Sequence, residues 1–513
     1  MGDPQSWKTS NPGWQYMFWS DNDLLDFMTR EFPDLLDLYV SYPKPVQRAD
    51  LARYCLLKHF GGVYADIDTR CLASLEPLAG DMRVILCEEP PEHHGPALVR
   101  GLRALYFNGT FASPPGHPFW DDVIGKCRLM RERRHFDVLE TTGPLILTAA
   151  VEQWPDRDQL ALNDCMLFAG LTAHWKTADT PSHGPFSHLK LSEHLWQGSW
   201  YKRRYERFYH RSLGRLRKLR HAVMSRYDLK FENERERIDT GLLTRALQSG
   251  AEVDPHVTVL IPVRNAEQFL PACFSLISQI DYPKTKINIT FGLGDSEDLS
   301  GTLIDQFILQ HGSEYAGVRC VRTVGNTPRV KRSARWKPKF QRARRAGLAR
   351  ARNQLIKDGL DTGAEWVLWI DADLVGYPAD ILRRLLAERE KIVTPDCVLV
   401  PGGPSYDLNA FLSNGVPSRS EYHRHLKGGI LQPPAEWDHR RHLHDLRYLK
   451  RVPLNGVGGT MLLVHADVHR SGLNFPERPY RDLIETEAFG QLARDLGVTP
   501  IGLPQIEIVH TSS

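Results

Sequence analysis

Short apolar runs that alternate with helix-length segments fill the second half of the chain, and they constrain its fold more than any other feature. Residues 256–263, 287–294, 317–324 and 366–371 are rich in Val, Ile, Leu and Trp, as buried strands are. Segments such as residues 341–358 separate them and have the length of helices. This alternation favours a mostly parallel, doubly wound sheet whose ligands bind beyond the carboxyl ends of the strands.

The first 200 residues show a less regular mixture of short strands and helices. Residues 16–20 (YMFWS) predict one strand and residues 63–68 (VYADID) another. Between them, residues 46–60 predict an amphipathic helix, which a Gly-Gly pair ends.

A basic segment, residues 202–236, separates the two patterned halves and has few apolar residues. We therefore expect an α/β domain over residues 1–200, a basic helical connector over residues 201–255, and a second α/β domain over residues 256–513. The connector could contact an anionic membrane surface or a partner subunit, but an exposed helix between domains is the favoured interpretation.

Composition excludes several classes of protein. The 65 Lys and Arg residues nearly balance the 62 Asp and Glu residues, and the net charge of +3 argues against a nucleic-acid binder. None of the eight cysteines forms a C-x-x-C pair, so buried thiols are expected rather than a zinc or redox site. No apolar run approaches the roughly 20 residues that span a bilayer, and no signal peptide is evident.

Two Asp-x-Asp triplets, each directly after an apolar run, carry the chemistry. They are Asp66-Ile67-Asp68 and Asp371-Ala372-Asp373. Residues two apart on a strand point to the same side, so each pair of carboxylates should project together. Mn²⁺ or Mg²⁺ would relieve their repulsion and would stabilise the charge of a departing diphosphate. The alternative is that each triplet only caps a turn, because Asp is common in turns.

Residues near the triplets are candidate companions. Asp50 and Arg53 lie one helical turn apart before the first triplet, and Arg352-Asn353 precede the second. An intrahelical ion pair explains the first two residues, and a solvated charge run explains much of residues 329–352. Later polar residues are ambiguous from position alone, namely His194, Ser199, Trp200, Glu485, Glu487 and His510.

Two family resemblances sharpen these hypotheses. Residues 6–200 resemble glycosyltransferase family 32, a family of initiating α-1,6-mannosyltransferase-like proteins from fungi, through the segments SWKTSNPGWQYMFWSDNDL, VQRADLARYCLLKHFGGVYADIDTRCLASLEPL, TTGP and HLWQGSW. Residues 256–510 resemble glycosyltransferase family 62, the fungal mannan-polymerase subunits, through QRARRAGLARARNQLI, EWVLWIDADLVGYPADIL, YDLNAF, VGGTMLLVHADVH and ETE…GLPQIEIVH.

The resemblances imply two GT-A-type folds in tandem and a set of site residues. In the first half they assign donor binding to Asp50, Arg53, Tyr64, Ser199 and Trp200, the sugar diphosphate to Asp66 and Asp68, and the metal to Asp68. In the second half they assign the metal to Asp371, Asp373 and His510, and we add Arg352 and Asn353 to the donor site.

The function implied is metal-dependent, retaining α-mannosyl transfer from GDP-mannose to a glycan or glycolipid acceptor. Two alternatives stay open: only the second half is catalytic while the first binds or assembles, or the first half uses another donor such as a UDP-hexose. A phosphate-handling hydrolase is a weaker possibility. The resemblance also implies a subunit of a mannosyltransferase complex in the Golgi. A first strand typical of family 32 is not evident here, so the start could be truncated, and a cytoplasmic location is the alternative.

Overall fold

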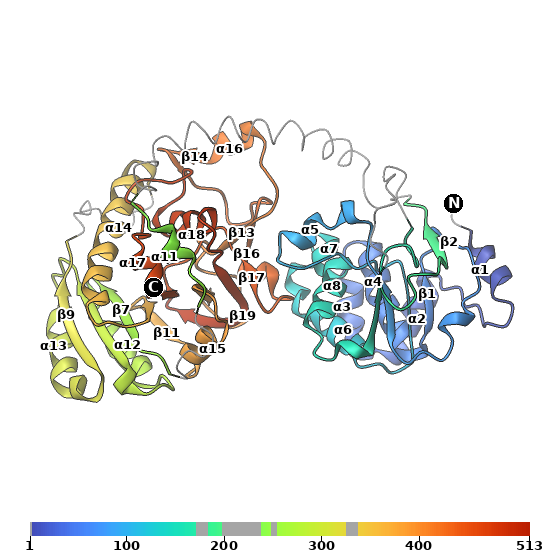
Figure 1. Ribbon diagram of the computed structural model, residues 1–513, viewed down its shortest axis with the longest axis horizontal. Coiled ribbons are helices and arrows are strands. Elements are labelled where there is room, and N and C mark those ends of the chain that lie inside the picture. Colours follow the sequence, from blue (N-terminus) through green and yellow to red (C-terminus); the bar gives the residue numbers. More distant parts are fainter. Residues whose placement is uncertain (1–2, 171–182, 197–236, 248–253, 325–336, 513) are drawn as a thin grey trace. The chain divides into compact units, whose positions relative to one another are not determined.

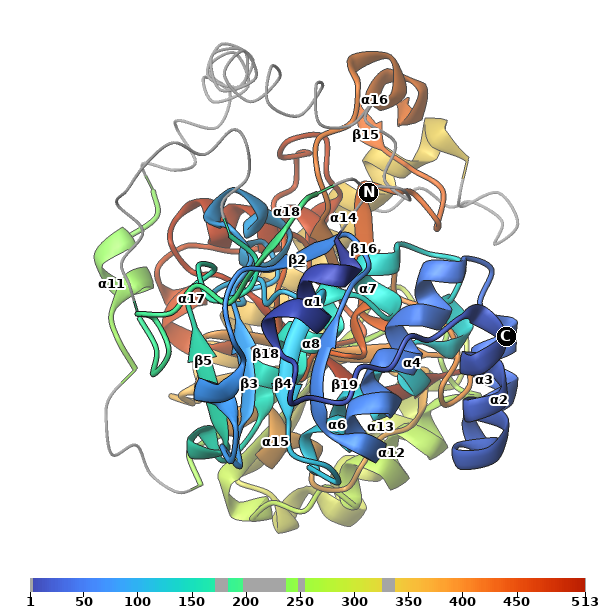
Figure 2. The same cartoon turned by 90° about the vertical axis from the view of Figure 1, so that its right-hand side faces the viewer.

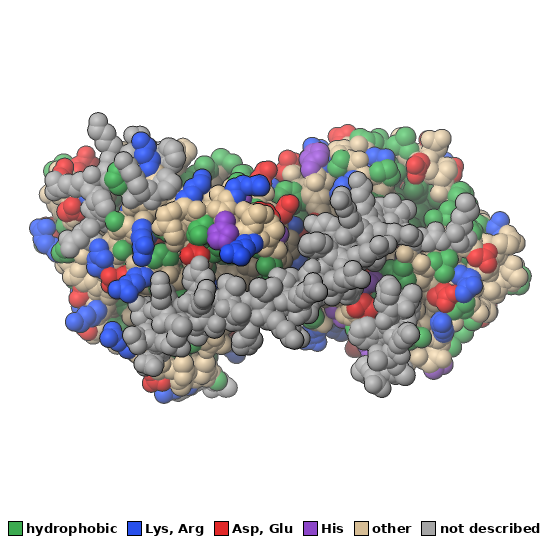
Figure 3. All heavy atoms as spheres, turned by 90° about the horizontal axis from the view of Figure 1, so that it is seen from above, with side chains coloured by type: hydrophobic (Ala, Val, Ile, Leu, Met, Phe, Trp, Pro, Cys, Tyr) green, Lys and Arg blue, Asp and Glu red, His purple; other side chains and the backbone are tan. Residues whose placement is uncertain are grey.

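The computed structural model describes residues 3–170, 183–196, 237–247, 254–324 and 337–512. The chain divides into two compact units, residues 1–215 and 216–513 (Figure 1). On the face shown in Figure 3, acidic and basic side chains are interspersed on each unit, as expected for a small net charge. None of the helices within the described ranges is both long and apolar enough to span a membrane.

The first unit is built on a mixed four-stranded sheet in the order β1-β4-β3-β5. Its strands are β1 (Gly62–Ala65), β4 (Thr110–Ser113), β3 (Val84–Cys87) and β5 (Leu160–Asn163). Only β3 and β5 pair in parallel, and Figure 2 shows β3, β4 and β5 next to one another. A separate antiparallel pair joins β2 (Thr69–Cys71) to β6 (Ser192–His194).

Helices complete the first unit, and α4 is central to it. They are α1 (Pro4–Ser10), α2 (Asp21–Glu31), α3 (Leu36–Ser41), α4 (Pro45–Phe60), α5 (Gly95–Leu98), α6 (Phe119–Leu129), α7 (Val138–Thr141) and α8 (Pro144–Gln153). The predicted helix over residues 46–60 is confirmed as α4, whose middle turns are fully buried. Residues 16–20 form no strand, so that prediction is wrong: their aromatic side chains are mostly exposed, and no neighbouring strand pairs with them.

The second unit holds a nine-stranded sheet whose main path is β11-β19-β12-β18-β10-β7-β8-β9. These strands are β7 (Val257–Val263), β8 (Ile287–Leu293), β9 (Gly317–Arg322), β10 (Trp366–Ile370), β11 (Leu374–Gly376), β12 (Ile392–Val398), β18 (Met461–His465) and β19 (Ile501–His510). A ninth strand, β17 (Val452–Pro453), pairs with β19. The α/β prediction is confirmed: β7, β8, β9, β10, β12 and β19 run in one direction, and β11, β17 and β18 run in the opposite direction.

Alternation along the strands explains why helices cover both faces of this sheet. Val259 and Leu368 point into one hydrophobic core, whereas Leu260 and Val367 point into the other. The helices are α11 (Thr240–Thr244), α12 (Leu270–Ser278), α13 (Ser300–His311), α14 (Pro338–Leu360), α15 (Ile381–Ala387), α16 (Arg419–His425), α17 (Ala466–Arg470) and α18 (Glu485–Asp495). Short pairs outside the sheet join β13 (Phe411–Ser413) to β16 (Arg440–His442) and β14 (Leu426–Lys427) to β15 (Ile430–Leu431).

Part of the predicted connector packs on the second unit. Leu243 of α11 is fully buried in one of its cores, and the backbone N–H of Asp239 donates to the carbonyl of Ser471 at 2.8 Å. The basic residues 202–236 lie outside the described residues. All eight cysteines are free thiols; seven are buried, as expected, and Cys320 is half-buried.

Candidate functional site

Both Asp-x-Asp triplets lie in turns between two strands rather than on the strands themselves. The first turn joins β1 to β2 and the second joins β10 to β11. In each, a backbone hydrogen bond closes the turn, from Thr69 N–H to the Asp66 carbonyl at 3.0 Å and from Leu374 N–H to the Asp371 carbonyl at 3.4 Å. The carboxylates are therefore gathered by a turn, not by the period of a strand.

The two turns have equivalent neighbours. The backbone N–H of Asp66 donates to the Gly109 carbonyl at 2.7 Å, just before antiparallel strand β4. The backbone N–H of Asp371 donates to the Thr460 carbonyl at 2.8 Å, just before antiparallel strand β18. Each triplet is thus held against the start of an antiparallel neighbour.

A histidine faces each turn. It lies on the strand that pairs with the strand directly after the turn, which is β6 in the first unit and β19 in the second. Thr69, directly after Asp68, pairs with His194 in the β2–β6 ladder. Leu374, directly after Asp373, pairs with His510 in the β11–β19 ladder. Sequence reasoning noted His194 but did not assign it to the site, and the recurrence of this strand–turn–strand–histidine arrangement is visible only in three dimensions.

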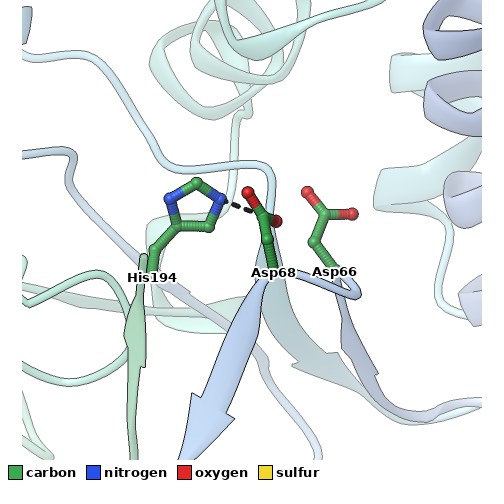
Figure 4. Close-up of side chains that lie close together, drawn as sticks. All are labelled: Asp66, Asp68 and His194. Carbon is green, nitrogen blue, oxygen red and sulfur yellow. Dashed lines mark ion pairs between the residues drawn. The ribbon is translucent and has the colours of Figure 1, made fainter. Parts of the chain in front are cut away.

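In the first unit this arrangement forms a compact cluster (Figure 4). Asp66, Asp68 and His194 are the one set of three described Asp, Glu, His or Cys residues whose potential ligand atoms all lie within 4.8 Å of one another. His194 Nε2 lies 3.1 Å from Asp68 Oδ1. Because the Trp196 backbone N–H donates to His194 Nδ1 at 3.1 Å, the proton of the neutral ring sits on Nε2 and is donated to Asp68.

Asp66 also has partners in the first unit. Arg53 meets its two carboxylate oxygens at 3.2 and 3.3 Å, and the Tyr64 hydroxyl donates to it at 2.8 Å. Arg53 Nη2 also pairs with Asp50 at 3.1 Å. Asp50 accepts further hydrogen bonds from Asn108 and Thr142, and burial raises its pKa to about 6.

The structure therefore brings together some of the site residues that were predicted in the first unit. Asp50, Arg53, Tyr64 and Asp66 form one connected network, and Asp68 lies beside Asp66 and pairs with His194. The two remaining predicted residues, Ser199 and Trp200, lie outside the described residues.

The second unit carries a cavity of about 920 Å³ beside its turn. One side is lined by the carboxyl ends of β7 and β8, with Asn265 and Asp295, and by Thr323 after β9. The rest of the lining includes Asp371 and Asp373 of the turn, His510, and residues from four other segments: Arg344, Arg345, Arg352, Tyr406, Asp407, Thr460, Glu485 and Thr486.

His510 and Asp373 form a close pair in this cavity, with Nε2 3.1 Å from Oδ1. His510 Nδ1 donates to the Thr511 carbonyl at 2.8 Å, because a carbonyl can only accept. In the neutral ring Nε2 then carries a lone pair that faces a carboxylate oxygen. Two acceptors at this distance require a proton or a cation between them, and although burial opposes it, the hydrogen bond to Asp373 raises the pKa of His510.

Asp371 lies opposite Arg352, whose Nη2 is 3.8 Å from Asp371 Oδ1. Burial raises the pKa of Asp371, and Arg352 opposes that rise. The Arg352 guanidinium lies over the rings of Trp369 and Phe475, and its Nη1 is buried with no hydrogen-bond partner among the described residues. A buried guanidinium nitrogen without an acceptor suits an anionic ligand.

Asn353, predicted beside Arg352, points elsewhere. Its side-chain amide donates to the Phe475 carbonyl at 2.9 Å and accepts from the Phe475 N–H at 3.0 Å. It does not line the cavity. Adjacent helical residues point about 100° apart, so only one of this pair can face the cavity.

Asp407 is a site residue that sequence reasoning missed. Its Oδ2 accepts from the Gly459 N–H at 3.0 Å and from the Thr460 hydroxyl at 3.2 Å, while Oδ1 accepts from the Asn409 N–H at 3.2 Å. It thereby fixes the loop whose Thr460 carbonyl holds Asp371. Its position in the YDLNAF segment, which carries part of the family resemblance, is the signal that could have found it.

Comparisons with known proteins bear on both units. Residues 238–479 match a family described as Anp1, and residues 1–85 match a region described as the glycosyltransferase sugar-binding region containing DXD motif. The Asp66-Ile67-Asp68 triplet lies in the sugar-binding region, and the Asp371-Ala372-Asp373 triplet lies in the region that matches Anp1. These matches confirm both predicted resemblances.

Individual relatives cover different shares of the chain. The mannan polymerase complex subunit mnn9 of Schizosaccharomyces pombe is 29% identical over 276 residues, which cover 48% of this chain and 81% of that protein. Inositol phosphoceramide mannosyltransferase 1 of the same organism is 32% identical over 139 residues, which cover 26% of this chain and only 40% of that protein. A solved structure, mannosyltransferase PcManGT from Pyrobaculum calidifontis in complex with GDP-Man and Mn²⁺, is 15% identical, covers 58% of this chain and 67% of that chain, and superposes with a TM-score of 0.31.

Proposed function

From the premise that the chain is a glycosyltransferase related to fungal mannosyltransferases, we propose that its second unit transfers a mannosyl group from GDP-mannose, with retention of configuration, to a hydroxyl of a glycan or glycolipid. The observation that carries this proposal is the cavity that combines Asp371, Asp373 and His510 with Arg352. The name of the mnn9 relative supports the choice of mannose.

Asp373 and His510 have the chemistry to bind a divalent cation such as Mn²⁺ or Mg²⁺, and Asp371 lines the same cavity, although the ligand atoms of these three residues do not all lie within 4.8 Å of one another. Asp371, Asp373 and the Nε2 lone pair of His510 would hold it, and the unrelieved contact between Asp373 and His510 favours a positive charge there. When bound, the cation would neutralise charge on the departing diphosphate.

The residues of the chain contribute independently of the cation. Arg352 offers its unpartnered Nη1 to a phosphate oxygen, and its position over two rings keeps the guanidinium in place. The ends of β7 and β8 place Asn265 and Asp295 where the nucleoside would bind, because ligands of such sheets lie beyond the carboxyl ends of parallel strands.

The direct test is hydrolysis of GDP-mannose by the full chain with and without Mn²⁺, followed by a screen of other GDP- and UDP-sugars. We expect Mn²⁺-dependent turnover that Asp371→Ala reduces by about 100-fold or more, since it removes stabilisation of developing charge. Parent-like turnover by that variant would contradict the assignment of the site.

A second candidate function concerns the first unit, which would bind a donor or a partner without catalysis. It is favoured by the pairing of Asp66 with Arg53 and Tyr64 and of Asp68 with His194. Asp68→Asn in the full chain distinguishes the possibilities. If hydrolysis of every nucleotide sugar persists in Asp68→Asn but is lost in Asp371→Ala, only the second unit is catalytic.

We further propose that the protein works as a subunit of a mannosyltransferase assembly in the Golgi. Relatives named as subunits of mannan polymerase complexes support this proposal. Purification of the tagged chain from its own cells, followed by identification of stoichiometric partners, tests it. A chain that elutes as a monomer and localises to the cytoplasm would contradict it.

A further inference from the structure

Two consecutive residues at the start of α18 line the cavity without complete hydrogen bonding. Glu485 and Thr486 are only 3% and 2% exposed. Glu485 Oε2 and Thr486 Oγ1 have no hydrogen-bond partner among the described residues. Buried polar atoms are almost always paired, and an unpaired carboxylate oxygen is especially costly, so such a pair beside a cavity points to a polar ligand.

The Glu485 carboxylate is already held in one orientation. Its Oε1 accepts a hydrogen bond from Arg345 Nη1 at 3.1 Å, and Gln341 accepts one from Arg345 Nε at 3.4 Å. Arg345 therefore fixes the side chain and leaves Oε2 as the free acceptor. The neutralised pair has no need of a second cation, so a hydroxyl donor suits the remaining oxygen better than a metal does.

Asp407, the other carboxylate on this part of the lining, cannot serve in the same way. Both of its oxygens accept hydrogen bonds from the protein, from Asn409 on one side and from Gly459 and Thr460 on the other. Its role is to hold the loop beside Asp371. Glu485 and Thr486 thus differ from it in having unused hydrogen-bonding capacity.

Glu485 and Thr486 begin α18, which packs against the segment just before Thr460: a Cβ atom at Gly490 would lie 2.9 Å from the Val457 backbone nitrogen. Strand β10, which ends at the Asp-x-Asp turn, lies between β7 and β18. The ends of β7 and β8 occupy one side, while Thr460 before β18 marks the other, where Asp407 holds its loop. A sugar nucleotide carries its diphosphate between nucleoside and hexose, so a diphosphate at the turn would direct the hexose to the second side.

We propose that Glu485 and Thr486 bind hydroxyl groups of the hexose in the nucleotide-sugar donor. Glu485 Oε2 accepts a hydrogen bond from one hydroxyl, and the Thr486 hydroxyl bonds to a second. Arg345 is a positioning residue for Glu485. This inference rests on the proposed function of the second unit and adds the part of the site that recognises the sugar.

The test compares GDP with GDP-mannose, which differ in the hexose. Calorimetric titration of the full chain in Mn²⁺ gives both dissociation constants for Glu485→Gln, which replaces the charged acceptor, and for Thr486→Val, which removes a hydroxyl that has no partner in the protein. Glu487→Gln is the matched control, because Glu487 is equally buried on the same helix but pairs with Arg440 at 2.6 Å and does not line the cavity.

We expect Glu485→Gln to bind GDP-mannose about 10-fold to 100-fold more weakly, and Thr486→Val about 3-fold to 10-fold more weakly, with GDP affinity unchanged within about 2-fold. Glu487→Gln should leave the ratio of the two affinities at the parent value. Equal losses for GDP and GDP-mannose, or no loss for either variant, would overturn the proposal. Thr486→Val keeps the test decisive if Glu485→Gln does not fold.

Binding by the parent protein shows whether a negative result refutes only the proposed hexose contacts or also the proposed function. A parent that binds GDP-mannose with Mn²⁺ while both variants bind it equally well would refute only the hexose contacts. A parent that binds neither GDP nor GDP-mannose would refute the proposed function, and the hexose contacts with it.

Discussion

Gly459 should control the position of Arg352. A Cβ atom added at Gly459 would lie 2.4 Å from Arg352 Nη2 and 2.6 Å from Nη1. Ordinary contact begins at 3.4 Å, and 3.4 − 2.4 = 1.0, so in Gly459→Ala the guanidinium must move by about 1 Å or more. It is nearly enclosed, with 13% of its side chain exposed, and rests on Trp369 and Phe475, so it can move only by leaving its place beside Asp371.

Because a displacement of about 1 Å of a positioning group can cost about 100-fold in rate, we expect Gly459→Ala to lower kcat for GDP-mannose hydrolysis by about that factor. The melting temperature should change little, since the guanidinium can turn toward the open cavity. The double variant Gly459→Ala/Arg352→Ala should be no slower than Arg352→Ala alone, because both changes act through one group.

Gly294 provides the matched control, since it also lines the cavity but a Cβ there meets its nearest atom at an ordinary 3.5 Å. Gly294→Ala should therefore keep the parent kcat. Parent-like kcat in Gly459→Ala, or equal losses in both alanine variants, would refute this account of Arg352.

Three further predictions concern other parts of the chain. His510→Ala should weaken Mn²⁺ binding to the second unit by about 10-fold or more in a titration followed by electron paramagnetic resonance, whereas His194→Ala should leave that binding constant unchanged. Burial raises the pKa of Asp396 to about 7, although hydrogen bonds from Ser405 and Arg447 oppose the rise, so the folded state binds the proton more tightly and the free energy of unfolding should fall between about pH 4 and pH 7. Asp396→Asn should flatten that slope in urea unfolding at pH 5 and pH 8, and an unchanged slope would contradict the assignment. Arg53→Met should destabilise the first unit by about 3 kcal/mol, because it leaves the buried Asp50 and the half-buried Asp66 facing each other without a cation; an unfolding midpoint like that of the parent would argue against this network.

The sequence predicted the elements that have a strong local pattern. Helix α4 and strand β10 are periodic or continuously apolar, and the triplets directly after β1 and β10 could be recognised from that context. The prediction that the carboxylates share a strand face was wrong in its reason, because both triplets lie in turns. Asp has a strong preference for turns, and that local preference decided the outcome.

What could not be predicted depends on contacts between distant segments. His194 faces Asp68 only because β6 pairs with β2, more than 100 residues away in sequence. The unpartnered oxygen of Glu485 depends on Arg345 in another helix, which occupies the other carboxylate oxygen. Asn353 was chosen with its neighbour, but its amide bonds to the backbone of Phe475 and does not line the cavity.

Helix α14 carries both Arg345 and Arg352, seven residues apart, on the side that meets the cavity. Seven residues make almost two full turns and a rise of about 10 Å, so one backbone sets the separation between Arg352, proposed to meet phosphate, and Arg345, which holds the proposed sugar contact Glu485. Inserting or deleting a single residue between them would rotate one arginine by about 100° away from its partner. The residues between Arg345 and Arg352 can therefore be substituted without changing this separation, whereas an insertion or a deletion between them would change it.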